Sequence, residues 1–341
     1  MLIPFIIPFI IAIFLSLNMG GSGTGPAFSA AFGANIIKQS LIPGLFGIAV
    51  FVGAIVGGEE TAKTVGKGLI NPDLMSFTVV SIILFSVSIS LLIANLFGIP
   101  QSTSQSTVLA IIAPAIYFNS LNSNKLLYEV LPTWFIMPIA AFIISFMIGK
   151  YIYKPIRKKG YTISKRVNNS PIVKGLILLM SLYVAFSIGT NNVANAAGPL
   201  ATMAANELNI AQNHAVHVMI LATLIVAPSF GIGSSFFGNK ILHKTGKDII
   251  LFGRIEAVII AFISGSLLLT ASLIKGIPTS LVQLNVAAII GIGVAKLGAK
   301  NIFRKTEVNK FFVMWLVSPV IAFILSLGLI YLADKINILY L

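Results

Sequence analysis

The chain has 341 residues, of which 57% are hydrophobic and only 9% are charged, and its mean hydropathy is +0.98. This composition excludes a soluble globular protein, because apolar runs of about 18 residues or more are typical of membrane-spanning helices. The net charge of +14 does not indicate nucleic-acid binding, since the basic residues fall mostly in short segments between apolar runs. Cysteine is absent, which excludes disulfides and thiolate metal sites.

Apolar segments recur along the whole chain and predict an all-α, multi-pass protein of the cell membrane. The first has no basic start and no clear cleavage site, so it is expected to be a span and not a signal peptide. Two further stretches, 20–37 and 190–206, are rich in small and weakly polar residues and are expected to be re-entrant or broken. The apolar segments lie at about 1–17, 41–57, 76–97, 104–118, 131–150, 172–188, 214–231, 249–274, 281–298 and 311–334.

A basic stretch divides the chain into two halves. Residues 151–170 carry six lysines and arginines and no acidic residue, so they are expected to form a cytoplasmic linker. Residues 1–150 are then the first transmembrane repeat, and residues 171–341 the second.

Three pairs of matching motifs occur in the same order in the two halves, which indicates an internal duplication. GIPQSTSQSTVLAIIA at 98–113 matches GIPTSLVQLNVAAIIG at 276–291. GGEETAKTVGKGLI at 57–70 matches FGNKILHKTGKDII at 237–250, and GGSGTGPAF at 20–28 falls more weakly opposite GTNNVANAA at 189–197.

The charges of matching segments predict that the second repeat is inverted. The expected loop 238–250 is strongly basic, whereas its counterpart 57–70 carries Glu59 and Glu60, so the two are expected on opposite faces of the membrane. Five crossings plus one re-entrant or broken segment per half satisfy these charges and place both termini outside. Inverted repeats with discontinuous helices at the midplane are typical of secondary transporters.

The first polar island, GTNNVANAAGPLATM at 189–203, contains Asn191, Asn192 and Asn195. Buried amides are costly unless a partner satisfies them, and a helix that begins here would offer its N–H groups to an oxyanion. We therefore predict an anion site at these asparagines. The matching stretch 20–28 could supply polar and backbone groups or could serve close helix packing, and both interpretations stay open. Its candidate binding residues are Ser22, Gly23 and Thr24.

The second polar island is PQSTSQST at 100–107. Proline suits the first turn of a helix, so Ser102 and Thr103 are candidate oxyanion donors at a helix N-terminus. Ser280 holds the matching position in the second half.

Glu256 lies well inside an apolar run, with Arg254 two residues before it. Ionisable residues in a membrane are functional candidates by default, so we predict that Glu256 carries a coupling proton. A structural ion pair near the helix end is the alternative. Residues two apart do not face each other on a helix, so each is expected to have another partner. His214 and His217 lack a nearby carboxylate, and no metal or cofactor is expected.

At these motifs the sequence resembles the inorganic phosphate transporter (PiT) family, whose halves carry G-x-N-D-x-A-N and G-x-P-x-S-T-T-H signatures. The resemblance implies an ion-coupled symporter for a tetrahedral oxyanion, with its site where the repeats meet. The matching stretches are Gly189-Thr-Asn191-Asn192-Val-Ala-Asn195, Gly98-Ile-Pro-Gln-Ser102-Thr103-Ser104-Gln105 and Gly276-Ile-Pro-Thr-Ser280.

The departures from these signatures bear on the substrate. The signature aspartates are replaced by Gly23 and Asn192, and the histidines by Gln105 and Gln283. Sulfate only accepts hydrogen bonds, and a carboxylate would repel it, whereas protonated phosphate can donate to one. The sequence therefore resembles the sulfate permease branch of the family, with a proton and not sodium as the coupling ion.

Other functions were weighed against proton-coupled sulfate import. A phosphate symporter, driven by sodium or protons, is the main alternative. An anion channel also needs polar groups at membrane depth, but an inverted repeat argues against it. The sequence shows no cluster of catalytic residues in the spans that would indicate an enzyme. The expected partners are the sulfate or phosphate anion and the lipid bilayer, and homo-oligomerisation is left open.

Overall fold

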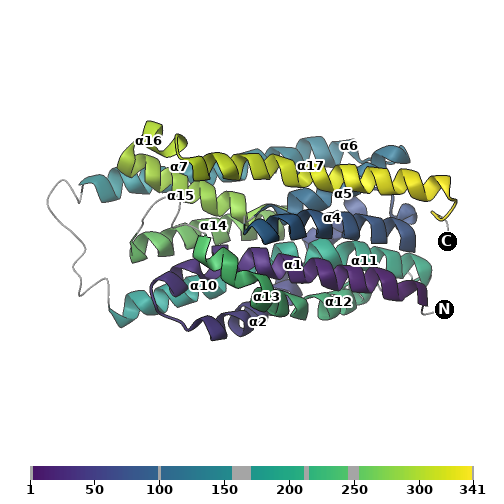
Figure 1. Ribbon diagram of the computed structural model, residues 1–341, viewed down its shortest axis with the longest axis horizontal. Helices are drawn as coiled ribbons and strands as arrows, with labels where there is room; N and C mark the ends of the chain where they lie inside the picture. The colour runs from purple at the N-terminus through teal and green to yellow at the C-terminus, as the bar shows by residue number, and fades with distance from the viewer. Residues whose placement is uncertain (1–2, 99–100, 156–169, 211–214, 245–252, 340–341) are drawn as a thin grey trace.

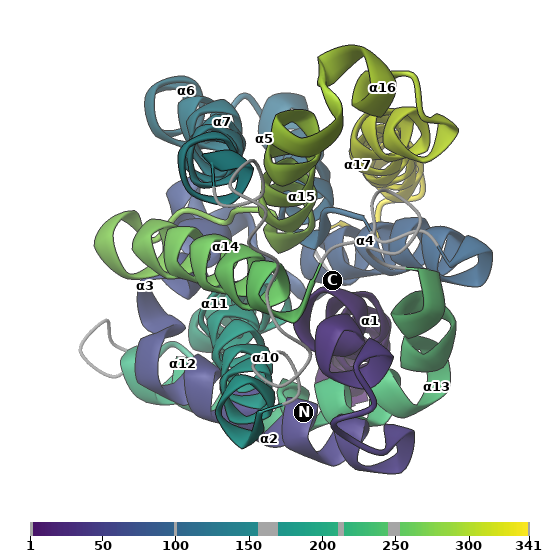
Figure 2. The same ribbon diagram turned by 90° about the vertical axis from the view of Figure 1, so that its left-hand side faces the viewer.

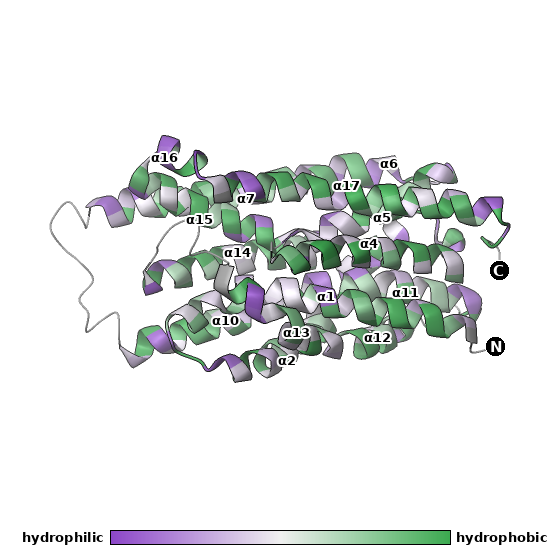
Figure 3. Ribbon diagram, viewed as in Figure 1, coloured by the Kyte–Doolittle hydropathy of each residue, from purple (hydrophilic) through white to green (hydrophobic). Residues whose placement is uncertain are grey.

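The computed structural model describes residues 3–98, 101–155, 170–210, 215–244 and 253–339, and the regular structure in this part of the chain is helical. Eight helices are long and apolar enough to cross a membrane. They lie side by side in one elongated bundle (Figure 1, Figure 2). Hydrophobic residues cover most of its length, and hydrophilic ones gather at its ends and in its middle (Figure 3). The predicted all-α, multi-pass fold is confirmed.

The two halves contain corresponding series of helices. The first half comprises α1 (Ile3–Gly33), η1 (Gln39–Leu41), α2 (Ile42–Gly57), α3 (Glu59–Lys63), η2 (Thr64–Gly68), η3 (Pro72–Leu74), α4 (Phe77–Phe97), α5 (Thr103–Tyr117), α6 (Ser123–Lys125), η4 (Leu126–Val130), α7 (Leu131–Met147) and η5 (Ile148–Tyr153). The second comprises α10 (Pro171–Asn192), α11 (Ala194–Glu207), α12 (Ala215–Val226), α13 (Pro228–Lys244), α14 (Arg254–Lys275), α15 (Leu281–Leu297), α16 (Ala299–Phe303) and α17 (Thr306–Lys335).

Helices α4 and α5 form a hairpin whose tip lies inside the bundle. Gly98 ends α4 with a left-handed φ of 65°, a conformation that glycine adopts without strain. At the open end of the hairpin, the Ser76 hydroxyl donates to the Leu339 carbonyl at 3.2 Å, and the Tyr117 hydroxyl donates to Asp334 at 2.6 Å. The start of α4 and the end of α5 therefore both lie beside the C-terminal end of α17.

Helices α14 and α15 form a second hairpin with the opposite direction. Gly276 ends α14 with φ of 60°, as Gly98 does in the first hairpin. The start of α14 and the end of α15 are joined by an ion pair between Glu256 and Lys296 at 2.5 Å. Since α15 ends beside α16, which precedes α17, the open end of this hairpin lies at the other end of the bundle (Figure 1).

Among the described residues, four helices per half are long and apolar enough to cross a membrane, but α4 and α14 are hairpin arms, so three other candidate spans per half remain where five crossings were predicted. The stretch 20–37 is no re-entrant segment, because α1 continues without a break to Gly33, whereas 190–206 is broken as predicted, at Val193 between α10 and α11. The segments 76–97 and 104–118 are the two arms of one hairpin. The two chain ends lie together in Figure 1, opposite the end where η5 stops and α10 begins.

The two segments expected to be loops are largely helical. Residues 57–70 continue α2 as α3 and η2, and α13 extends to Lys244. The rest of 238–250 and most of the linker 151–170 lie outside the described residues. The charged residues of these segments predicted loops, but in the structure they lie on the exposed faces of helices whose opposite faces are buried.

Helix α1 packs against α13 through its glycines. A Cβ on Gly20 would lie 2.1 Å from the Phe230 carbonyl oxygen, and one on Gly21 would lie 2.4 Å from the Phe237 Cβ. Close helix packing therefore explains these two residues of the small-residue stretch.

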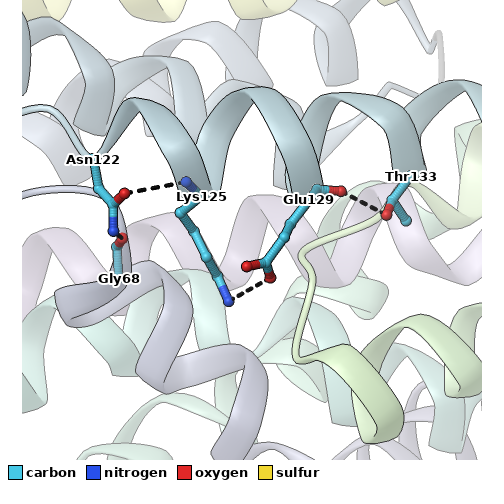
Figure 4. A network of polar contacts seen from close by, with 5 residues as sticks. All are labelled: Gly68, Asn122, Lys125, Glu129 and Thr133. Atoms are coloured by element: carbon cyan, nitrogen blue, oxygen red, sulfur yellow. Dashed lines mark hydrogen bonds and ion pairs between the residues drawn. The ribbon is translucent and has the colours of Figure 1, made fainter.

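A polar network secures the start of α7 at the end of the bundle that holds both termini (Figure 4). The Asn122 side chain donates to the Gly68 carbonyl at 3.1 Å and accepts from the Lys125 N–H at 3.1 Å, so it caps α6 and ties it to η2. One turn later Lys125 pairs with Glu129 at 2.8 Å, and Thr133 donates to the Glu129 carbonyl.

Candidate functional site

The tips of the two hairpins meet inside the bundle through a pair of glutamines. Gln105 Nε2 donates to Gln283 Oε1 at 3.1 Å, and Gln283 Nε2 donates to Gln105 Oε1 at 2.7 Å. Their side chains are buried, with exposed fractions of 8% and 6%. Because the two residues hold matching positions in the repeated motifs, their reciprocal bonds join the hairpins at equivalent points.

The N-terminus of α5 begins at this meeting point with unpaired backbone donors. Ser102 caps the helix, since its hydroxyl accepts from the Gln105 N–H at 3.3 Å. The first helical bond runs from the Ser106 N–H to the Ser102 carbonyl. The N–H groups of Thr103 and Ser104 precede it and have no partner within the helix.

The N-terminus of α15 repeats this geometry. Ser280 caps it by accepting from the Gln283 N–H at 3.3 Å, and the first helical bond runs from the Leu284 N–H to the Ser280 carbonyl. The N–H groups of Leu281 and Val282 are thereby left without a helical partner.

Both N-termini line one small pocket. The positive ends of two helix dipoles and their unpaired N–H groups favour an anion here. The polar side chains around it are amides and hydroxyls, and none of the described lining residues is charged. The pocket therefore suits an anion that accepts hydrogen bonds and needs no acceptor in return. Its lining residues are Ser22, Gly23, Pro26, Gln101, Thr103, Ser104, Ile188, Asn192, Thr279, Ser280, Leu281 and Val282.

Asn192 presents an uncommitted amide to this pocket. It is the last residue of α10, where the chain breaks at Val193 before α11. Its exposed fraction is 8%, and its buried Oδ1 has no hydrogen-bond partner among the described residues. A buried amide in this state is costly unless a ligand satisfies it.

Asn191 differs from its neighbour, because its amide is fully hydrogen bonded. Its Oδ1 accepts from the Ser104 hydroxyl at 3.0 Å and from the Thr279 N–H at 3.1 Å. Its Nδ2 donates to the Ser272 hydroxyl at 2.8 Å and to the Ile277 carbonyl at 3.2 Å. These bonds link α10 to both hairpins, so Asn191 has a structural role and stabilises the site.

The other predicted binding residues divide between the pocket and its surroundings. Ser22, Gly23, Thr103 and Ser280 line the pocket, with the Ser22 hydroxyl donating to the Met19 carbonyl at 3.1 Å.

Thr24 points away from the pocket, since its hydroxyl donates to the Gly20 carbonyl at 2.7 Å and contacts Ser234 of α13 at 2.8 Å. Asn195 donates to the Ser104 hydroxyl at 3.3 Å, while its Oδ1 has no partner among the described residues.

Three further lining residues with polar side chains were not among the predicted ligands. Gln101, Ser104 and Thr279 all belong to the polar islands at the hairpin tips. Their position in these polar islands is the feature of the sequence that could have identified them as candidate ligands. Which side of each short helix faces the pocket depends on the way in which the two hairpins meet.

Comparison with known proteins places the chain in a family. A model described as "Phosphate transporter family" matches residues 19–326. The chain belongs to this family. It is 33% identical over 324 residues to a protein named "Sulfate permease CysP" from Bacillus subtilis (strain 168), a match that covers 94% of this chain and 84% of that one.

The fold of this transporter is also that of a solved structure. A chain titled "The sodium-dependent phosphate transporter" superimposes with a TM-score of 0.83 at 21% sequence identity. The match covers 98% of this chain and 99% of the other. The phosphate transporter family, the eight apolar helices and this fold together make the protein a multi-pass anion transporter of the cell membrane.

Glu256 and Arg254 of this transporter lie away from the pocket. Glu256 pairs with Lys296 and accepts from the Gly253 N–H at 2.7 Å, while Arg254 donates to the Ala34 carbonyl at 3.1 Å. Both residues begin α14, a 22-residue helix about 33 Å long that leads to the hairpin tip. The expectation that each has another partner is confirmed. A coupling role for Glu256 stays a prediction. His214 lies outside the described residues.

Proposed function

We propose that this transporter imports sulfate together with protons. The observation that supports this most is the pocket at the hairpin tips, where two helix N-termini, amides and hydroxyls converge and the lining contains no carboxylate. Sulfate carries no proton at neutral pH, so all its oxygens accept, and every polar group of the pocket except the amide oxygens can donate.

Substitutions at two positions explain why the pocket lacks a carboxylate. Gly23 and Asn192 stand at the positions of the family's signature aspartates, and both line the pocket. A carboxylate at either place would repel sulfate but could accept the proton of a phosphate. The 33% identity to a protein named as a sulfate permease supports the same substrate.

Coupling to protons follows from the charge of the anion. An inside-negative membrane potential opposes entry by about 2.3 kcal/mol per charge per 100 mV. Sulfate therefore needs at least two protons to enter without net charge. Glu256 could carry one only if protonation broke its pair with Lys296, so we infer a second carrier or a water-borne proton.

We further infer that the end of the bundle where α10 begins is cytoplasmic. Lys154 follows η5, Lys174 lies near the start of α10, Lys296 near the end of α15 and Lys300 in α16, and the positive-inside rule places such a basic end in the cytoplasm. Residues 1–150 and 171–341 then form two inverted repeats. Labelling of a Gly160→Cys variant only from outside the cell would contradict this topology.

Uptake into proteoliposomes tests the substrate and the coupling together. With sodium replaced by choline and an inward pH gradient imposed, we expect saturable uptake of labelled sulfate that stops when a protonophore removes the gradient. Phosphate uptake that requires sodium, with no uptake of sulfate, would contradict the proposal and support the phosphate symporter instead.

A further inference from the structure

A second small pocket lies beside the one at the hairpin tips and shares the lining residue Pro26 with it. It is enclosed by α1, α10, α14 and α15, which surround the middle of the bundle in Figure 2. On α15 the lining passes from Val282 to Asn285 and then to Ile289, about one turn at each step. The second pocket therefore continues the first toward the end of the bundle where α10 begins.

Two buried polar side chains of this second pocket lack hydrogen-bond partners. Asn285 has an exposed fraction of 6% and Ser181 of 2%. Neither side chain makes a hydrogen bond to any described residue, although both line the pocket. Ser29 of α1 adds a third hydroxyl to the lining. Their polar atoms are not among the fully enclosed unsatisfied ones, so they reach the open space of the pocket, where a polar ligand or water can bind them.

The pocket also carries no uncompensated negative charge. None of its described lining residues is acidic. The nearest carboxylate along the chain is that of Glu256, next to the lining residue Ala257, and Lys296 neutralises it at 2.5 Å. An anion can therefore pass this part of the route without meeting the repulsion of an unpaired carboxylate.

The matching region of the first repeat is closed. The alignment that pairs Gln283 with Gln105 also pairs Asn285 with Thr107 and Ile289 with Ile111. Thr107 and Ile111 are both completely buried. Asn285 and Ile289 thus line the second pocket, whereas their counterparts on α5 line neither of the two pockets, although the two hairpins carry the same motif.

We propose that Asn285 and Ser181, with Ser29, form a second anion station on the inner half of the transport route, which holds the same tetrahedral oxyanion after it leaves the hairpin tips. The proposal rests on the proposed function for the direction of transport and for the choice of sulfate. The station supplies hydrogen-bond donors from an amide and from hydroxyls.

Thiol labelling can test the station, because the chain contains no cysteine. A Ser181→Cys variant places one thiol in the second pocket. We expect a small charged, membrane-impermeant thiol reagent to modify it from the side of residues 151–170, and sulfate to slow this modification at least fivefold. In a Ser181→Cys, Asn285→Leu variant, modification without sulfate should continue and the protection by sulfate should be lost.

Thr107→Val in the same Ser181→Cys background is the matched control, since Thr107 is the repeat counterpart of Asn285. It should leave the protection intact. Asn285→Gln, which keeps the amide, should restore part of it. Absence of modification at Ser181→Cys, or modification that sulfate does not slow in protein that still binds sulfate, would overturn the station while leaving the proposed function untouched. Protection by phosphate but not by sulfate would support the station and overturn the proposed substrate.

Discussion

Two adjacent asparagines should respond in opposite ways to the same substitution. Asn192 faces the pocket with an unpartnered Oδ1, whereas Asn191 makes four hydrogen bonds to the two hairpins. Asn192→Ala should therefore weaken anion binding and spare the fold. Asn191→Ala should destabilise the fold first.

The magnitudes follow from the bonds involved. A hydrogen bond from the Asn192 amide to a charged oxyanion contributes about 1.5–3 kcal/mol, so its loss should weaken sulfate binding about 10- to 150-fold. Because the structure offers its buried Oδ1 no partner among the described residues, loss of the amide should not lower the unfolding free energy. Asn191→Ala removes four bonds worth about 1 kcal/mol each and leaves the Thr279 N–H unsatisfied at a further cost of about 1–3 kcal/mol, so the unfolding free energy should fall by about 5–7 kcal/mol in all.

Calorimetric titration with sulfate and thermal unfolding of both purified variants would measure these effects side by side. The expected pattern is weak binding with native thermal stability for Asn192→Ala, and a lowered unfolding temperature for Asn191→Ala. If Asn192→Ala binds sulfate as the native protein does, the amide is no ligand. If both variants lose equal stability, the distinction between an anion-binding Asn192 and a structural Asn191 is refuted.

Three further predictions concern the hairpins and the substrate. A double-mutant cycle of Gln105→Leu and Gln283→Leu, read out by thermal unfolding, should give a coupling free energy of about 1–2 kcal/mol, because each single change leaves an unpaired amide. Additive effects of the two substitutions would show that the pair is not formed. Lys296→Met should lower the unfolding free energy by about 3–5 kcal/mol, because it leaves the buried Glu256 carboxylate without a partner, and Glu256→Gln should restore part of this loss. If chemical denaturation shows no such restoration in the double variant, the buried pair is contradicted. Asn192→Asp should raise the ratio of phosphate to sulfate uptake, and an unchanged ratio would refute the argument from the missing aspartate.

Hydropathy and the repeated motifs were enough to predict the fold class, but not the path of the chain. The stretches 76–97 and 104–118 read as two spans, because an apolar arm of a hairpin has the same composition as a crossing. Gly98 reverses the chain in the bundle interior, where the second hairpin meets the first. The glycine-rich stretch 20–37 looked discontinuous, yet α1 passes through it because α13 packs closely against its glycines.

The site was predicted at the level of islands and only partly at the level of residues. Composition alone identifies a group of amides such as Asn191 and Asn192 as unusual in a membrane segment. It does not distinguish the two, because consecutive residues on a helix face different neighbours. Asn191 meets Thr279, which lies 88 positions away, and only the assembled hairpins reveal this contact.

The position of a bound anion is the most direct test of the account. Selenate has the shape and charge of sulfate and a strong anomalous signal, so crystals grown with it would locate the site. We expect the selenium between the N-termini of α5 and α15, with its oxygens within about 3 Å of the N–H groups of Thr103, Ser104, Leu281 or Val282. Selenate bound elsewhere in the bundle, with this pocket empty in saturated crystals, would contradict the central claim.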